Sequence, residues 1–131
     1  MMFALDTNTV IYFFKGFGRV AERLLATPLD QIAIPVIVLY ELEVGIAKSN
    51  QPEKRRGQVD ELSALVRILP FGPAEARTTA QLRASLEAIG RPIGPLDTLI
   101  AGTALHHSAT LVSHNLSEIG RVAGLKVEDW Y

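Results

Sequence analysis

Short apolar runs alternate along the chain with longer segments in which apolar residues recur at helical spacing. The apolar runs predict short strands at 2–5, 31–34, 67–71, 110–113 and 126–130. Helical spacing and capping residues predict helices at 9–15, 18–27, 35–49, 52–68, 74–89 and 95–107. Because short strands joined through helices form parallel sheets with helices on both faces, the pattern favours the α/β class.

Three carboxylates interrupt segments that are otherwise apolar. Asp6 closes the first run, Glu41 lies inside the helix predicted at 35–49, and Asp97 follows Pro95 in the first turn of the last long helix. No Lys or Arg lies within several residues of Glu41 or Asp97. Since carboxylates are almost never buried without a partner, these positions require a chemical explanation.

A shared metal ion is the explanation that the residue types favour. Ligands of parallel sheets gather beyond the carboxyl ends of the strands, where the three acids are expected to converge. At an effective dielectric near 20, two like charges about 4 Å apart repel by roughly 4 kcal/mol. Three such pairs would cost about 12 kcal/mol, as much as the whole stability of a domain. A hard divalent ion such as Mg²⁺ or Mn²⁺ removes this cost and enables hydrolysis of phosphodiesters.

The composition indicates one compact domain spanning 1–131. Of its 131 residues, 48% are hydrophobic and 21% are charged, which argues against disorder. No apolar run approaches the roughly 20 residues that span a bilayer, and no basic segment precedes the first apolar residues, so neither a membrane helix nor a secretory signal is expected. The absence of cysteine fits a reducing cytoplasm. The net charge of -1 leaves room for a locally basic face.

Four segments stand in a specific order along the chain. They are Leu-Asp-Thr-Asn at 5–8, Leu-Tyr-Glu-Leu-Glu-Val-Gly at 39–45, Arg-Pro-Ile-Gly-Pro-Leu-Asp-Thr-Leu-Ile-Ala at 91–101, and Thr-Leu-Val-Ser-His-Asn at 110–115. In this order they resemble the PIN-domain ribonucleases, and within them the VapC toxins of bacterial toxin–antitoxin pairs. The similarity continues to the ending Gly-Leu-Lys-Val-Glu-Asp-Trp at 124–130.

The resemblance implies a three-layer α/β/α domain with a central, mostly parallel sheet of four to five short strands. It also implies that Asp6, Glu41 and Asp97 form a catalytic acidic triad, with Asp6 and Asp97 binding Mg²⁺, for which Mn²⁺ can substitute. Many PIN domains carry a fourth Asp where this chain has an Asn, and Glu118 is carried over as the fourth acid. Thr7 and Asn8 would orient the metal-bound water or the first carboxylate. The residues expected to orient the substrate are Thr7, Asn8, Ser113, Asn115 and Arg91.

The activity implied by the resemblance is site-specific cleavage of structured RNA, with the anticodon loop of tRNA as the leading substrate. Water would be the nucleophile and would leave a 5′-phosphate and a 3′-hydroxyl. A VapB-like antitoxin would inhibit the enzyme. The enzyme is expected to be a homodimer and not to associate with a membrane. Eight basic residues against five acidic ones between Lys48 and Arg91 could supply the positive surface that RNA needs.

Other interpretations remain open for single residues. Asp6 could be only a helix N-cap, Glu41 could face solvent beside Glu43, and Asp97 could only complement the helix dipole. Asn115 and Glu118 have the spacing of a capping box. The pair at 106–107 is expected to add favourable charge at the C-terminal end of a helix. The basic run at 54–56 could be a solvated face or could contact RNA. Phe13, Phe14 and Phe17 could belong to the core or to a dimer or antitoxin groove.

Two other functions compete with the ribonuclease. A receiver-like phosphoacceptor domain would need a Lys after its last strands, and 110–115 contains none. A catalytically silent PIN-fold module that binds RNA or protein would not need the three acids. Binding of Mn²⁺ would separate this silent module from the enzyme.

Overall fold

A five-stranded sheet forms the middle layer of the protein. The computed structural model describes residues 1–131. The strands are β1 (Phe3–Leu5), β2 (Ile32–Pro35), β3 (Arg67–Leu69), β4 (Thr110–Val112) and β5 (Val127–Glu128). Their order is β3-β2-β1-β4-β5, and every neighbouring pair is parallel. The predicted α/β class is confirmed, and the sheet is parallel throughout.

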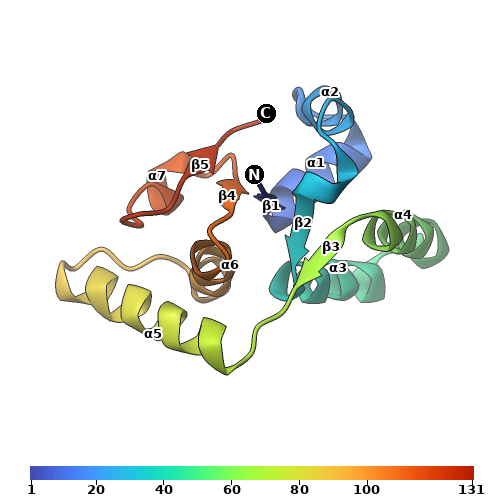
Figure 1. Ribbon diagram of the computed structural model, residues 1–131. Helices are drawn as coiled ribbons and strands as arrows, with labels where there is room; N and C mark the ends of the chain where they lie inside the picture. The colour runs from blue at the N-terminus through green and yellow to red at the C-terminus, as the bar shows by residue number, and fades with distance from the viewer.

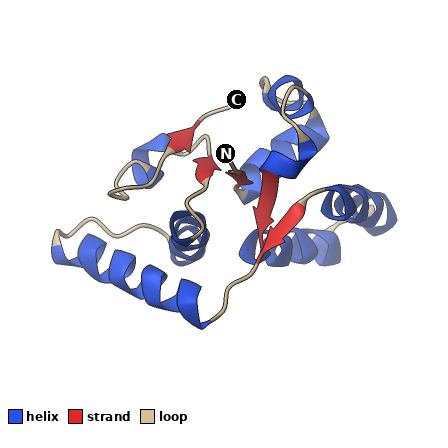
Figure 2. Cartoon of the chain, in the orientation of Figure 1, coloured by secondary structure: helices blue, strands red, loops and turns tan.

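Helices cover both faces of this sheet. They are α1 (Thr7–Lys15), α2 (Val20–Leu25), α3 (Val36–Lys48), α4 (Pro52–Leu65), α5 (Pro73–Ala88), α6 (Pro95–His106) and α7 (Leu116–Ile119), with a 3-10 turn at Leu29–Gln31. α1 and α2 lie on one side of the row of strands, and α5 and α6 lie on the other (Figure 1). The strands form one band between the helices (Figure 2). The predicted three-layer arrangement is therefore confirmed.

The core follows from burial of the sheet on both faces. Every residue of β1, β2 and β4 is buried, which explains why these strands are continuous apolar runs without polar alternation. Trp130, only 2% exposed, packs its ring 5.3 Å from that of Phe3 and anchors the last segment against β1. No helix is long and apolar enough to cross a membrane.

Several predicted boundaries were wrong. Pro35 does not open the third helix; it ends β2, pairs with Leu69 of β3 and precedes α3 as its N-cap. This position suits proline because its φ of -58° is the one that the ring imposes. α1 begins at Thr7, two residues early, because the Asp6 side chain already caps it. α2 and β5 are shorter than predicted, and α4 stops at Leu65, before β3 begins.

The short helix α7 was not predicted. It has only four residues, too few for a hydrophobic period to be visible in the sequence. Its N-cap, Asn115, makes no side-chain capping bond to the backbone, so the capping box that the spacing suggested does not form. The helix nevertheless matters, because it carries Glu118.

A close contact joins α5 to α6. Gly102 of α6 faces Thr79 of α5, and a Cβ built on Gly102 would overlap the Thr79 side chain. At one end of the same interface, His107 Nε2 lies 2.7 Å from Glu75 Oε2. His106 Nδ1 lies 2.8 Å from Thr78 Oγ1. The two histidines thus join α6 to α5, and their role is more specific than the general dipole effect expected from the sequence.

Candidate active site

The site lies where the strand order reverses. β1 pairs with β2 on one side and with β4 on the other, and ligands of such sheets bind at this switch point. Asp6 follows β1 directly. Its backbone N–H donates to Val112 O of β4 at 3.1 Å, so the ends of both strands are joined at this residue.

Asp6 has one carboxylate oxygen engaged and one free. Thr9 N donates to its Oδ1 at 2.9 Å, which caps α1, while Oδ2 accepts no hydrogen bond from the chain. The capping role considered from sequence is therefore real, and it does not exclude a second role. Thr9 also donates from its hydroxyl to Val112 O at 3.1 Å. Thr9 was not among the residues predicted from the sequence. The one signal in the sequence was its place as a small polar residue in the first helical turn after Asp6.

Glu41 points toward α1 from the middle of α3. Thr7 Oγ1 donates to Glu41 Oε1 at 2.6 Å, across 34 positions of sequence. The alternative that Glu41 faces solvent beside Glu43 is wrong, because Glu41 is half-buried and accepts the Thr7 hydroxyl. Glu43 instead pairs with Arg56 on α4. Thr7 thus holds Glu41, whereas the sequence led us to expect it beside the metal-bound water or the first carboxylate.

Asp97 occupies the first turn of α6 and is half-buried. The pKa of its carboxyl lies above the usual range, and burial is the largest cause. The remaining causes are repulsion by the carboxylates of Asp6, Glu118 and Glu41, in that order. The carboxylates of Asp6, Glu118 and Glu41, which come from three other segments, are therefore close enough to Asp97 to raise its pKa.

Glu118 is held by the turn that precedes α7. Asn115 Nδ2 donates to Glu118 Oε2 at 2.8 Å, and Asn115 N donates to Ser113 Oγ at 3.1 Å. Ser113 itself is fully buried at the end of β4. Ser113 and Asn115 therefore hold Glu118 beside the other acids and do not line the site as free polar groups.

Two of the expected residues make no contact with the acids. Asn8 is exposed on α1, and its side chain forms no hydrogen bond. Arg91 is also exposed, and with Ser117 and Arg121 it lines a shallow hollow beside α7. Arg91 remains a residue that RNA could contact.

The chemistry of the donors fits a hard cation. All four acids offer oxygen, and none of the four forms an ion pair with Lys, Arg or His. As the side chains lie, no three acids or histidines form a group that could hold one metal ion. The Oδ2 of Asp6 is the oxygen of that residue left free for an ion.

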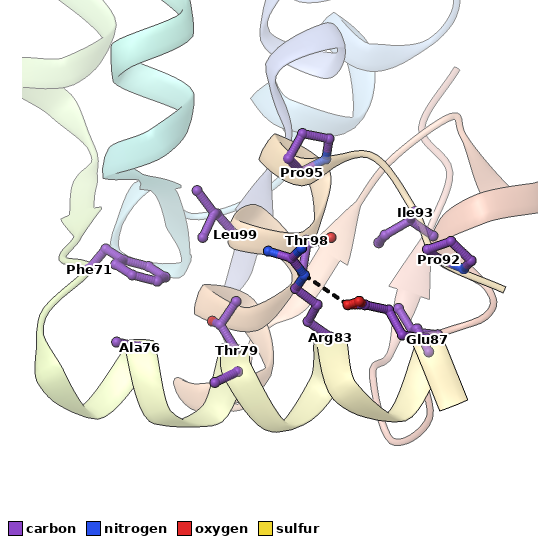
Figure 3. A pocket seen from close by; sticks show the side chains of 12 residues that line it. Phe71, Ala76, Thr79, Arg83, Glu87, Pro92, Ile93, Pro95, Thr98 and Leu99 are labelled. Carbon is purple, nitrogen blue, oxygen red and sulfur yellow. Dashed lines mark hydrogen bonds and ion pairs between the residues drawn. The ribbon is translucent and has the colours of Figure 1, made fainter. Parts of the chain in front are cut away.

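A hollow between α5 and α6 is separate from this site. It measures about 610 Å³, with apolar walls that include Phe71, Ile93 and Leu99 (Figure 3). Arg83 and Glu87 form an ion pair at its edge, 3.1 Å apart. None of the four acids lines it, so it is not the reaction centre.

Comparison with known proteins gives a consistent result. The PIN domain family matches residues 3–125. The tRNA(fMet)-specific endonuclease VapC of Shigella flexneri is 34% identical over 130 residues, which cover 99% of this chain and 98% of that protein. Ribonuclease VapC2 of Rickettsia felis is 32% identical over 138 residues, with the same coverage.

The solved structures agree with the sequence relatives. DNA-bound VapBC from Salmonella typhimurium contains a chain that matches with a TM-score of 0.93 and 35% identity, covering 100% of this chain and 99% of that one. VapBC2 from Rickettsia felis, bound to a DNA fragment from its promoter, matches with a TM-score of 0.90 and 33% identity over 100% of both chains. The chain therefore belongs to the PIN domain family, within its VapC group.

Proposed function

We propose that this protein is a metal-dependent endoribonuclease and the toxin of a VapBC-type toxin–antitoxin pair. The observation that supports the proposal is the raised pKa of Asp97, caused first by burial and then by the carboxylates of Asp6, Glu118 and Glu41, with no cationic side chain paired to any of the four. A silent binding module would have no use for so costly an arrangement.

Each of the four acidic residues has its own role in the proposed reaction. Mg²⁺ or Mn²⁺, when bound, supplies positive charge for the phosphate and acidifies the attacking water. Asp6 and Asp97 would hold the ion. Glu41 keeps Oε2 free while Oε1 accepts the Thr7 hydroxyl, so it can accept a proton from the water. Glu118, held by the hydrogen bond from Asn115, would be the fourth carboxylate of the site. Attack by water breaks the bond from phosphorus to O3′ and leaves a 5′-phosphate and a 3′-hydroxyl.

The proposed substrate is a structured RNA, with tRNA as the first candidate. The relatives in Shigella flexneri and Salmonella typhimurium are named as tRNA(fMet)-specific endonucleases, so initiator tRNA is the RNA to test first. Proteins read RNA mainly through its shape and through unstacked loop bases. The anticodon loop offers such bases, and the exposed side chain of Arg91 would contact the neighbouring phosphates. Such a substrate would locate the activity in the cytoplasm.

The proposed inhibitor is a VapB-like antitoxin that covers a groove ending at the acids. A hollow of about 310 Å³ lies between α1, α3 and α4, with apolar walls that include Ile11, Phe14 and Ile46. Glu41 lines it at one side, and Lys15 and Arg55 are basic residues in its wall. An amphipathic segment of the antitoxin could fill this groove and approach the site. Phe14 fits the partner-groove alternative raised by the sequence.

We further propose that the protein is a homodimer, on the basis of its family. Sedimentation at micromolar concentration should give twice the mass of one chain. A strict monomer under these conditions would contradict the proposal and leave the ribonuclease activity unaffected.

The test of function is cleavage of purified tRNA and of total RNA by wild type and by Asp6→Asn. With Mg²⁺, the wild type should cut at defined positions, and end mapping should find 5′-phosphates. Chelation and Asp6→Asn should each abolish the cuts. Cleavage that survives either one, or a 2′,3′-cyclic phosphate at the cut, would overturn the mechanism.

A further inference from the structure

An aromatic cluster includes His114, which follows β4 two residues after the strand ends. The rings of His114 and Tyr131 stack, with centroids 4.3 Å apart and planes inclined by 20°. Tyr12 of α1 meets Tyr131 edge-on, with centroids 5.0 Å apart at 76°, and lies 6.1 Å from His114. These separations place Tyr12 beside the stack and not on top of it. The outer faces of the stack are therefore not covered by Tyr12.

Hydrogen bonds hold this stack rigidly. Asp129 Oδ2 lies 2.8 Å from His114 Nδ1, and Asp129 Oδ1 accepts from Tyr131 N at 2.9 Å. Arg19 N donates to Tyr131 O at 3.1 Å. One aspartate thus positions both rings, so little conformational freedom remains to be lost when a ligand stacks on them.

The stack differs from the buried aromatic pair of the core. Trp130 and Phe3 are 2% and 9% exposed, whereas Tyr131 remains 46% exposed and the His114 side chain also remains 46% exposed. Rings needed only for packing would be covered like Trp130. Two ordered rings that stay half in solvent are available for a planar ligand.

The position of the stack connects it to the reaction centre. His114 stands between Ser113 and Asn115, the residues that hold Glu118. Tyr12 belongs to α1, the helix that Asp6 caps. Two exposed cations adjoin the cluster, and neither is engaged in an ion pair. Lys15 Nζ lies 5.7 Å from the ring centroid of Phe17, which neighbours Tyr12, and Arg19 bonds Tyr131 through its backbone N–H. Aromatic faces beside unpaired cations form the combination that binds single-stranded nucleic acid.

We propose that the His114–Tyr131 stack is a platform for one unpaired base of the RNA, adjacent to the phosphodiester that is cut. This inference rests on the proposed ribonuclease function and adds a specificity element to it. The base extends the stack, and Lys15 or Arg19 contacts a neighbouring phosphate. Loop bases can reach such a platform and paired bases cannot, so the platform selects unpaired segments of structured RNA.

The test uses an RNA oligonucleotide with the sequence around the mapped cut and 2-aminopurine placed in turn on each side of it. Binding is measured in chelator with the Asp97→Asn variant, so that the oligonucleotide stays intact. Stacking should quench the fluorescence at one position. Adding Tyr131→Leu should remove the quench and raise Kd by about tenfold, the scale of one base stacked on an aromatic ring.

Matched variants separate stacking from folding. Tyr131 packs closely on Gly18, so Tyr131→Leu can disturb this segment, whereas Tyr131→Phe keeps the ring and should keep the quench. His114→Leu provides an independent variant, and it should also lose the fluorescence quench. Equal quench and equal Kd in all variants would overturn the platform, and this result would indicate that the rings serve a protein partner instead. Wild type that fails to cut RNA would overturn the proposed function and the platform with it.

Discussion

At the scale of single residues, the site depends on how neutral hydroxyls and amides hold acids in place. Thr7 fixes Glu41, and Asn115 fixes Glu118. The sequence predicted the acids because they interrupt apolar segments. It could not predict which neighbour holds which acid, because the bond from Thr7 to Glu41 spans 34 positions and depends on the packing of α1 against α3.

Replacing Thr7 by Val should impair cleavage without unfolding the protein. The methyl group keeps the shape of the side chain but cannot donate to Glu41, so the carboxylate loses a charge-assisted hydrogen bond. We expect kcat for tRNA cleavage to fall by roughly tenfold or more, since such a bond is worth about 1.5–3 kcal/mol.

Thr7→Ser is the control for this change, because it retains the hydroxyl. Initial rates of cleavage should fall far less for Ser than for Val, while both variants keep the wild-type Tm within a few degrees. Equal rates for Val and wild type would show that Glu41 needs no orientation by residue 7.

At the scale of helices and strands, the sequence predicted where most of them lie but not where each begins and ends. The apolar runs located all five strands. For β1, β2 and β4 the reason is that strands buried on both faces must be apolar. Pro35 was assigned to a helix because proline suits a first helical turn, but it suits the last residue of a strand equally well. α7 could not be found from periodicity, since one helical turn contains no repeat.

The contact between α5 and α6 predicts a pH-dependent stability. The pKa of Glu75 is lowered chiefly by hydrogen bonds from the backbone N–H groups of Glu75 and Gly72, with a further contribution from His107. A carboxyl with a lowered folded pKa stabilises the fold above its unfolded pKa of about 4.3, and this contribution is lost as pH falls through the folded value. Glu75→Gln should therefore have a lower Tm than wild type near pH 6, and the difference should shrink as the pH falls below about 4.

Glu61→Gln provides the comparison for Glu75, because Glu61 is exposed on α4 and forms no hydrogen bond or ion pair. Its Tm should follow that of the wild type across the same range. If the gap between Glu75→Gln and wild type is the same at pH 3 and pH 6, ionisation of Glu75 does not stabilise this interface.

The same interface predicts a steric effect at Gly102. A methyl group there would overlap Thr79, whose buried hydroxyl has no hydrogen-bond partner. Overpacking of this kind costs about 1–3 kcal/mol, so Gly102→Ala should lower Tm by roughly 4–11 °C in a chain of this size. Combination with Thr79→Ala should recover part of the loss, because it removes two of the three atoms that clash.

Gly57→Ala is the matched control for Gly102→Ala. Gly57 lies in α4 with no atom near its would-be Cβ, so alanine should stabilise this helix by up to about 1 kcal/mol. Opposite signs at the two glycines, measured by thermal unfolding, would support the steric account. A rise in Tm for both would show that the α5–α6 contact relaxes freely.

At the scale of the whole molecule, the crowded acids link stability to metal. A ligand that binds only the folded state stabilises it by about 2.7 kcal/mol at one hundred times its Kd. Mg²⁺ or Mn²⁺ should therefore raise the Tm of the wild type by roughly 10 °C at this ratio.

In chelator, Asp97→Asn should melt no lower than wild type, because it removes a charge that three other acids oppose. The same variant should gain much less from Mg²⁺, because it has lost a ligand. Glu61→Gln, which lies outside the site, should respond to the ion as wild type does. A wild-type Tm that stays constant through millimolar Mg²⁺ and Mn²⁺ would favour the silent binding module over the enzyme, since the four carboxylates would then converge without an ion.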